Sequence, residues 1–435
     1  MRNYIENVAY NFATQTICLI AGLISNIVIA RLLGPEGKGI ITLLSNYVSI
    51  AVIIFMLGMS ESNVFYLSKG SFSQSDILST DLFHLTFMTI VFLTFSLLLK
   101  NIFLTGFLKG INDYFFFMSL LYFPMQFLYL HLITILQGHK CLKDYSLSFL
   151  LRSLTLLILQ LLFIPHWNIS GGLVALILST LTVNLINLSK LPRKNNKLCI
   201  INIDFLRKSV FFGIKSQIGL LLNFLDRRLD FFIINSFLNP IQVGYYSVAV
   251  IIAEIPWYFS NAVGVVLFPE ITTKEKNQSY QLIAFICRNT IIITVGLIII
   301  VILCANLFIR LIFGLKFVES IVPLQLLLPG VIGLAINRII CAGFSGTGRP
   351  ELGTLTVVFS SVATIVFDFL LIPRLGIKGA SLASTISYFI SAVTGIILFR
   401  RISNLCFSDI LLFKISDLKK YSQIIEKIKG IGKNE

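Results

Sequence analysis

Charge is scarce in this sequence, and its cysteines and histidines form no recognisable arrangement. Of 435 residues, 13% are charged and 56% are hydrophobic, a balance that excludes an ordinary soluble domain. The seven cysteines are scattered without a C-x-x-C pair and the four histidines are isolated along the chain, so we predict neither a disulfide framework nor a metal site. No segment between the apolar runs is large enough for a folded catalytic domain. We therefore predict no catalytic residues, no enzyme activity and no cofactor.

Long apolar runs are present instead. A helix needs about 20 residues to cross about 30 Å of hydrocarbon, and the chain offers twelve runs near that length. They lie near 8–30, 40–60, 80–99, 114–136, 146–164, 172–190, 209–236, 245–268, 282–304, 320–342, 353–372 and 380–399. The pattern predicts an all-α polytopic membrane protein with about twelve transmembrane helices.

The net charge of +15 is best explained by membrane topology. With both termini in the cytoplasm, the predicted inside segments hold far more Lys and Arg than the outside turns, and basic residues are densest in 190–208 and after residue 400. This is the positive-inside distribution of membrane proteins. It predicts a multi-pass protein with cytoplasmic N- and C-termini that contacts lipid and not nucleic acid.

The chain also contains an internal repeat. Residues 31–39 match 236–244 in Leu, Pro and Gly, while Gly138 and the corner at 169–172 match Gly346 and 377–380 at nearly the same offset. Two related halves are typical of transporters built from repeats. With six spans each, the halves should share one orientation and be related by a pseudo-two-fold axis along the membrane normal.

This organisation predicts four segments. They are an N-terminal six-helix lobe (1–190), a basic cytoplasmic interlobe linker (191–208), a C-terminal six-helix lobe (209–400) and a basic amphipathic cytoplasmic tail (401–435). In the tail, apolar residues recur at helical spacing with Lys between them. Two interpretations are open, a helix lying on the inner leaflet and a solvated tail.

The seventh span carries a cluster of polar residues, which is costly in hydrocarbon and therefore a functional hypothesis. Asp226 and Asp230 are four residues apart and share a helical face with Asn223. Arg227 can pair with Asp230, while Arg228 needs a partner on another helix or on a ligand. Two structural alternatives stand beside this interpretation. In the first alternative, the stretch is a loop between two shorter apolar segments. In the second, it is an ion-paired scaffold that holds helices together.

Other charged residues within the spans complete the candidate sites. Arg31 and Arg338 join the seventh-span cluster as candidates for substrate binding, because guanidinium groups bind phosphate in a bidentate manner. Buried carboxylates can carry a coupling H⁺ or Na⁺, since desolvation favours their neutral form. The candidates for that role are Asp226, Asp230, Glu254 and Asp368.

Several stretches together resemble the polysaccharide flippases of the Wzx type. They are 30–39 (ARLLGPEGKG), 228–230 (RLD), 243–249 (VGYYSVA), Phe268-Pro269, 346–350 (GTGRP) and 372–380 (IPRLGIKGA). These flippases form the polysaccharide transporter branch of a superfamily shared with MATE exporters and lipid II flippases. The resemblance implies a two-lobed helical bundle in which charged residues of the seventh span line a cavity. One departure is Asp368, which stands where the family pattern often has Asn.

The resemblance further implies a function. Such a protein moves undecaprenyl-pyrophosphate-linked oligosaccharide across the bacterial inner membrane by alternating access, for O-antigen or capsule biosynthesis. Its expected partners are the lipid-linked glycan, the bilayer, and a polysaccharide polymerase with a chain-length regulator. Two alternatives remain open. One is a cation-coupled multidrug or metabolite exporter of the MATE type, and the other is a non-transporting scaffold for polysaccharide assembly.

Overall fold

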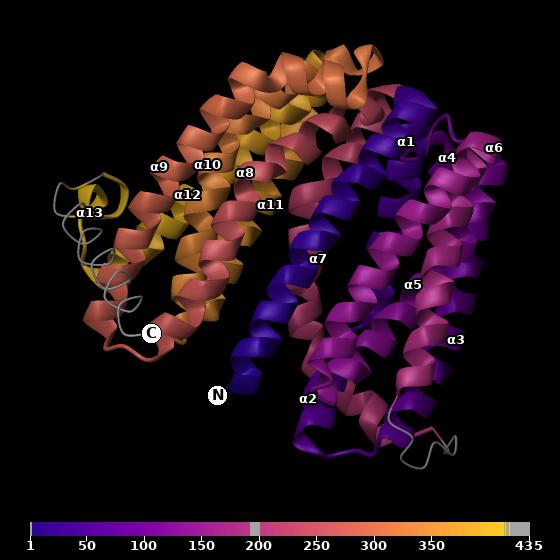
Figure 1. Cartoon of the computed structure of the whole chain (residues 1–435), viewed down its shortest axis with the longest axis horizontal. Helices are drawn as coiled ribbons and strands as arrows, with labels where there is room; N and C mark the ends of the chain where they lie inside the picture. Colours follow the sequence, from indigo (N-terminus) through magenta and orange to yellow (C-terminus); the bar gives the residue numbers. More distant parts are fainter. Residues whose placement is uncertain (1, 192–200, 413, 415–416, 418–435) are drawn as a thin grey trace. The chain divides into compact units, whose positions relative to one another are not determined.

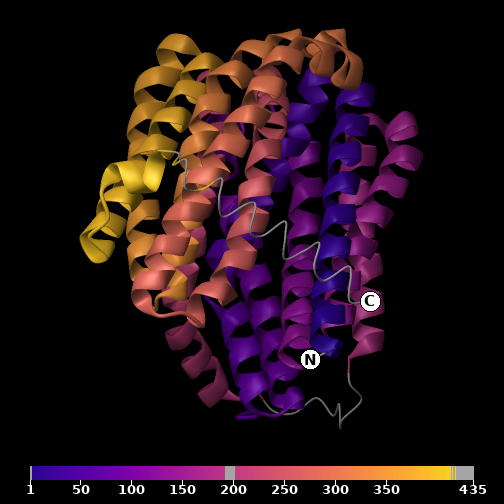
Figure 2. The ribbon, with the colours of Figure 1, turned by 60° about the vertical axis from the view of Figure 1, so that its left-hand side comes forward.

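The computed structural model describes residues 2–191, 201–412, 414 and 417, and these fold into helices and short connections without a β-strand (Figures 1 and 2). Part of the predicted linker and most of the tail beyond residue 412 lie outside the described residues. The helices are α1 Arg2–Met56, α2 Met59–Lys69, α3 Gln74–Leu98, α4 Lys100–Thr105, α5 Asp113–Gly138, α6 Leu142–Lys190, α7 Ile203–Phe237, α8 Pro240–Thr272, α9 Lys276–Phe308, α10 Ile321–Gly346, α11 Pro350–Leu375, α12 Ile377–Ser403 and α13 Phe407–Leu411. A π-helical turn η1 (Ile309–Phe313) and a 3₁₀ turn η2 (Leu315–Ser320) join α9 to α10.

The described helices account for the twelve predicted spans. Within the described residues, nine segments are long and apolar enough to cross a membrane by length and composition. Two of them contain two helices each, because α1 is divided at Gly34 (φ 69°) and α6 at Asn168 (φ 48°). In Figure 1 the N-terminus and α2 lie at the same end of the first unit, so α1 reverses at this turn. The nine segments therefore contain eleven helices, and α7, which carries more charged residues than any of the nine, is the twelfth. These twelve helices match the predicted runs in order, and the predicted all-α membrane fold is confirmed.

The contacts divide the chain into two compact units. The first contains Met1–Val248, Leu307–Ile321 and Ile372–Ile377, and the second contains Ala249–Asn306, Val322–Leu371 and Lys378–Glu435. Helix α7 therefore packs with the first unit, although it is the first span of the predicted C-terminal lobe. The predicted lobes follow the sequence repeat, whereas the two units follow the contacts between residues, so their boundaries differ. The division into lobes at 1–190 and 209–400 stays a prediction.

Two glycines of the repeated turn lie against each other in the first unit. A Cβ atom on Gly39 would overlap the carbonyl oxygen of Pro240, and a Cβ atom on Gly244 would overlap that of Pro35. Each contact thus joins the glycine of one copy to the proline of the other. Only glycine permits such a close approach of two backbones. The Pro-x-x-x-Gly spacing shared by the two copies is explained by this reciprocal crossing.

Further matched positions adopt related local geometry. Asn168 (φ 48°) and Gly376 (φ 62°), which are separated by the repeat offset of 208, both lie at turns in the left-handed region. Gly138 and Gly346 end α5 and α10, and their backbones approach Leu67 and Ile271 respectively. The repeat inferred from sequence is therefore visible in local structure.

Helix α7 is held against α2 by a second glycine pair. A Cβ atom on Gly58 would overlap the backbone carbonyl of Gly213, and a Cβ atom on Gly213 would overlap the carbonyl of Gly58. At the other end of α7, Asn235 donates through Nδ2 to the carbonyls of Phe107 (3.0 Å) and Lys109 (2.9 Å). These contacts fix both ends of the charged helix within the first unit.

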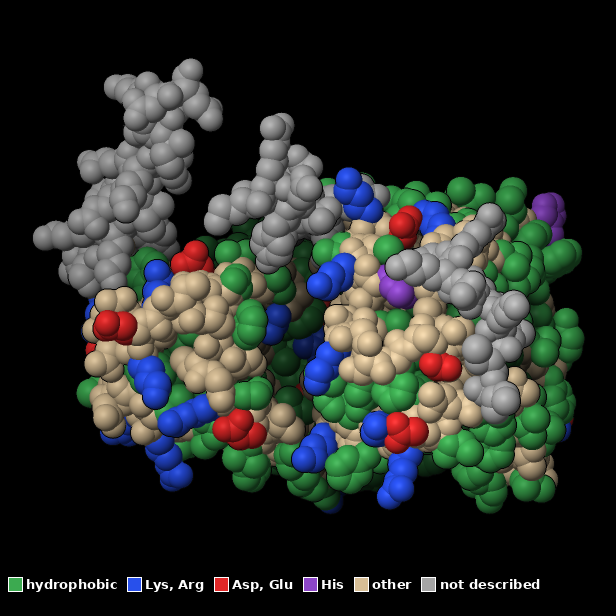
Figure 3. Space-filling model, turned by 90° about the horizontal axis from the view of Figure 1, so that it is seen from below, with side chains coloured by type: hydrophobic (Ala, Val, Ile, Leu, Met, Phe, Trp, Pro, Cys, Tyr) green, Lys and Arg blue, Asp and Glu red, His purple; other side chains and the backbone are tan. Residues whose placement is uncertain are grey.

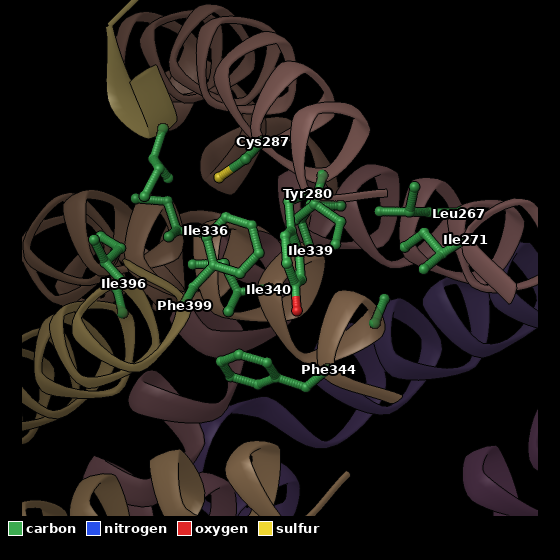
Figure 4. Close-up of a cluster of buried hydrophobic side chains, with 14 residues drawn as sticks. Leu267, Ile271, Tyr280, Cys287, Ile336, Ile339, Ile340, Phe344, Ile396 and Phe399 are labelled. Carbon is green, nitrogen blue, oxygen red and sulfur yellow. The ribbon is translucent and has the colours of Figure 1, made fainter. Parts of the chain in front are cut away.

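The second unit has its own hydrophobic core, formed by α8, α9, α10 and α12 (Figure 4). Ile410 of α13 is fully buried in this core, so the start of the tail docks on the unit. Beyond it, Asp417 forms a bidentate ion pair with Arg288 of α9 at 2.8 and 2.9 Å, and both side chains are buried. The described part of the tail is therefore held by protein, while its residues 418–435 lie outside the described part.

We expect Gly39→Ala to destabilise the first unit, because its methyl group would overlap the Pro240 carbonyl and force the two backbones apart. Overpacking of this kind costs about 1–3 kcal/mol or more. The midpoint of thermal unfolding in detergent measures the effect. Gly22→Ala is the matched control, since Gly22 also lies in α1 and a methyl group there would meet nothing within 4 Å. Equal midpoints for the two variants would contradict the tight crossing.

Candidate functional site: the charged turns of α7 and Lys38

The charged stretch of the seventh span is part of one continuous helix, so the alternative of a loop at 226–230 is wrong. Asp226 and Asp230 are buried on α7, with exposed fractions of 8% and 3%. The hydroxyl of Tyr246, itself fully buried on α8, donates to Asp230 Oδ2 at 2.6 Å. A hydrogen bond to a carboxylate stabilises its ionised form. Asp230 therefore has a local donor that permits a negative charge inside the protein.

The two arginines and Asn223 are less enclosed. Arg227 and Arg228 are half-buried, and the Arg228 guanidinium lies 5.8 Å from the ring centroid of Phe231, in range of a cation–π contact. Asn223 is exposed and donates to the Gly219 carbonyl of its own helix at 2.9 Å. Of the five predicted residues, the two aspartates are the enclosed ones and Asn223 is the most accessible.

A buried lysine between the first two predicted spans, Lys38, belongs to the same region. Lys38 lies in the second half of α1 and is 3% exposed. Its Nζ donates to Asn26 Oδ1, a neutral oxygen, and its side chain lies within electrostatic range of Arg228. No carboxylate lies within ion-pair distance of Lys38 in the described part of the chain. Lys38 thus lies near Arg228 and has no counter-charge of its own within the described residues.

Burial of Lys38 could not be read from the local sequence. The residue follows the turn at Pro35 by less than one helical turn, and charged residues at that position ordinarily mark the membrane interface. The internal repeat carries the relevant signal. Gly39 must pack against the second copy, and this places its neighbour Lys38 next to the helices of that copy.

Arg31 has a structural role in the described part. Its Nε donates to the Ile312 carbonyl at 2.7 Å, and its terminal nitrogen donates to Leu311, so it satisfies two carbonyls of η1. The side chain is exposed. These contacts neither require nor exclude substrate binding, and its assignment to the cavity stays a prediction.

Three predicted residues belong to the second unit. Arg338 of α10 donates through Nε to Asn261 Oδ1 at 2.8 Å, and it fits against α8 where Gly264 leaves room for it. Glu254 on α8 is half-buried. Asp368 on α11 is fully buried, and α11 and α12 carry buried Ser and Thr residues, which are Thr356, Ser360, Ser361, Thr364, Ser381, Ser384, Ser387 and Ser391. The second unit thus contains a carboxylate in surroundings rich in neutral oxygen atoms.

Two of the four histidines, which are isolated along the chain, come together in the folded protein. His84 of α3 and His131 of α5 are buried, and their ring nitrogens lie 3.4 Å apart. His131 Nδ1 lies 3.2 Å from Asp81 Oδ1. The 47 residues between the two histidines leave no local spacing signal. Packing of α3 on α5 creates the cluster.

Comparison with known proteins places the chain in a family. Residues 4–273, more than half of its length, match the model of the polysaccharide biosynthesis protein family. The chain belongs to this family. It is 26% identical over 304 residues to an uncharacterized membrane protein of Methanocaldococcus jannaschii, with 66% of this chain and 59% of the relative covered. It is also 26% identical over 169 residues to the probable low-salt glycan biosynthesis flippase Agl15 of Haloferax volcanii, with 38% and 36% covered. The match thus spans less than two thirds of either relative.

Solved structures share the fold of this family member. A lipid II flippase MurJ in an inward closed conformation matches with a TM-score of 0.75 at 14% identity, covering 91% of this chain and 90% of that one. An inward-facing MATE family multidrug resistance transporter of the MOP superfamily matches with a TM-score of 0.70 at 16% identity, covering 89% and 94%. These likenesses show that the chain has the fold of these transporters.

We expect Lys38→Met to leave stability unchanged or to raise it by about 1 kcal/mol, because the variant removes a desolvated cation that lies near another cation. Replacing buried charge by an apolar side chain of similar length is often neutral or stabilising. Thermal unfolding of the purified protein provides the measurement. A fall of several degrees in the midpoint would show that Lys38 is a structural residue, and the anion-binding interpretation would then lose its basis.

Proposed function

We propose that the chain is a flippase that moves a lipid-linked oligosaccharide across the membrane by alternating access. The observation that carries the proposal is the placement of Lys38 and Arg228 together inside the first unit, where Lys38 has a neutral hydrogen-bond partner. Their mutual repulsion is relieved by an anionic ligand. The pyrophosphate that links a glycan to its lipid carrier supplies such an anion, and arginine and lysine both bind phosphate oxygens.

The remaining polar groups suit the other parts of such a ligand. Asp226 and Asp230 accept hydrogen bonds, and exposed Asn223 both donates and accepts. Sugar hydroxyls need both kinds of partner. The description of the Haloferax relative as a glycan biosynthesis flippase supports a substrate of this class. We further propose that the lipid carrier is undecaprenyl pyrophosphate and that the membrane is the bacterial inner membrane. The transported glycan would then be a unit of O-antigen or capsule.

The proposed orientation places both termini in the cytoplasm. Basic side chains are more frequent than acidic ones on the face shown in Figure 3, and the positive-inside rule assigns such a face to the cytoplasm. On this orientation the turn between the halves of α1 lies on the outer side. We also propose that a buried carboxylate, Asp226, Asp230, Glu254 or Asp368, carries a coupling H⁺ or Na⁺.

An exporter of organic cations is the alternative that the shared fold raises. Lys38 and Arg228 oppose a cationic ligand, whereas the carboxylates of Asp226 and Asp230 on the same stretch of α7 favour one. A transport assay with both substrate classes distinguishes the two functions.

The test is flipping in proteoliposomes that contain a labelled undecaprenyl-pyrophosphate oligosaccharide, followed by its exposure to an external glycosidase. We expect Arg228→Glu to reduce the rate by at least about 100-fold, since reversing a charge at a phosphate contact costs several kcal/mol. Arg374→Glu is the matched control, because Arg374 is an exposed arginine at the end of α11.

Flipping at the wild-type rate by Arg228→Glu, at equal protein level, would contradict the assignment of the site. Absence of flipping by the wild-type protein, together with transport of an organic cation, would contradict the proposed function. A non-transporting scaffold would transport neither class of substrate.

A further inference from the structure

A buried row of three titratable side chains crosses the first unit away from α7. Asp81 and His84 lie on α3 and His131 lies on α5. Their exposed fractions are 3%, 2% and 1%. Asp81 Oδ1 lies 3.2 Å from His131 Nδ1, and His131 Nε2 lies 3.4 Å from His84 Nδ1. We call these three residues the histidine row.

The two ends of the histidine row differ. At one end, Asp81 Oδ2 accepts a hydrogen bond of 2.7 Å from Asn63 of α2, whose amide also lies 3.4 Å from the Thr134 hydroxyl. At the other end, His84 Nε2 is buried and has no hydrogen-bond partner among the described residues. A buried polar atom without a partner is costly. Asp81 Oδ1 and His131 Nδ1 are also buried without a hydrogen-bond partner among the described residues, although they lie 3.2 Å apart. A proton placed between these two atoms would satisfy both.

We propose that the histidine row is a proton-binding site that takes up one proton during transport; its role in transport rests on the proposed function. Before uptake, Asp81 is ionised and both imidazoles are neutral, with the His131 Nε2 proton directed at His84 Nδ1. The proton binds between Asp81 Oδ1 and His131 Nδ1, which lie 3.2 Å apart and have no hydrogen-bond partner among the described residues. His131 then becomes an imidazolium beside Asp81.

The charge of the row explains why one proton is bound. Uptake changes the net charge from −1 to 0 and converts an unpaired buried carboxylate into an ion pair, which is the better state in a low-dielectric interior. A second proton would create two adjacent cations. Because the three groups interact at short range, the proton belongs to the row as a whole.

The surrounding helices bring other ionisable groups, but none of them lies within ion-pair distance of Asp81 in the described part of the chain. On α2, Glu61 Oε2 is buried without a partner among the described residues. From α6, Arg152 donates to Tyr122 at 2.7 Å and lies over the ring of Tyr129. The remaining Asp, Glu, Lys and Arg side chains described on α1, α3, α5 and α7 are Arg31, Glu36, Lys38, Asp76, Asp113, Asp204, Arg207, Lys208, Lys215, Asp226, Arg227, Arg228 and Asp230.

The row lies where three helices meet, so a bound proton changes the forces between these helices. Asp81 lies seven residues, or about 10 Å, from the start of α3. Its two oxygens contact α2 and α5, and α2 in turn meets α7 at the Gly58–Gly213 crossing. A change in the charge of the row therefore alters the attraction among α2, α3 and α5 next to the helix that carries the proposed substrate site.

The direct test is a pH titration of the full protein labelled at histidine, in lipid, by magic-angle-spinning NMR. Loss of signals in His84→Gln and His131→Gln identifies the two residues, and exposed His166 is the internal reference. We expect the wild-type row to bind one proton in a single macroscopic step. Asp81→Asn should move that titration down by about 1–3 pH units, because the imidazolium loses its counter-charge. If His84 and His131 both stay neutral down to about pH 4, the proposal of a proton-binding site is wrong.

A second measurement tests the role of the row in transport. Wild-type flipping should accelerate under an imposed pH gradient, and this acceleration should fall at least about tenfold in Asp81→Asn while flipping without a gradient persists. An unchanged gradient effect in Asp81→Asn would overturn coupling through the row. If the wild-type protein does not flip the glycolipid, the proposed function fails, and the NMR titration still decides whether the row binds a proton.

Discussion

The cost of placing charge inside hydrocarbon constrains this protein most strongly. Each buried ionisable group needs a specific compensating partner, and the first unit shows how these are supplied. Asp230 receives the hydroxyl of Tyr246, Lys38 donates to the amide oxygen of Asn26, and Asp81 lies beside His131 and Asn63. These partners lie on neighbouring helices or distant turns, so the close packing of the helices is what permits the charges. The glycine crossings at Gly39–Gly244 and Gly58–Gly213 are therefore linked to function through geometry.

The compensation is incomplete at several places in the described part of the chain, and two of them bear on the proposals. Lys38 has a neutral partner and lies near Arg228, while Asp81 Oδ1, His131 Nδ1 and His84 Nε2 have no hydrogen-bond partner among the described residues. A protein usually retains such costly groups for function. The first place suits an anion and the second suits a proton, which are the two species that a proton-coupled flippase of an anionic lipid has to bind.

Much of the fold was accessible from the sequence because it depends on patterns along the chain. Apolar runs predicted the helices, and the repeated Pro and Gly spacing predicted the turns at Gly34 and Pro240. The intramembrane charge of α7 pointed to a candidate site. By contrast, Lys38 lies just after a turn, and the apolar-run boundaries therefore assigned it to the outside. His84 and His131 are brought together by packing of α3 on α5, and their spacing along the chain carries no periodic signal.

The central claim is that Lys38 and Arg228 bind the phosphate groups of a lipid carrier. The most direct test is the thermal unfolding midpoint of the purified protein with undecaprenyl pyrophosphate, compared with uncharged undecaprenol. At a ligand concentration near 100 Kd, binding to the folded state adds about 2.7 kcal/mol. The account predicts that the pyrophosphate raises the midpoint, that the alcohol does not, and that the difference disappears in the Lys38→Met/Arg228→Gln double variant. Equal stabilisation of wild type and double variant by the pyrophosphate would contradict it.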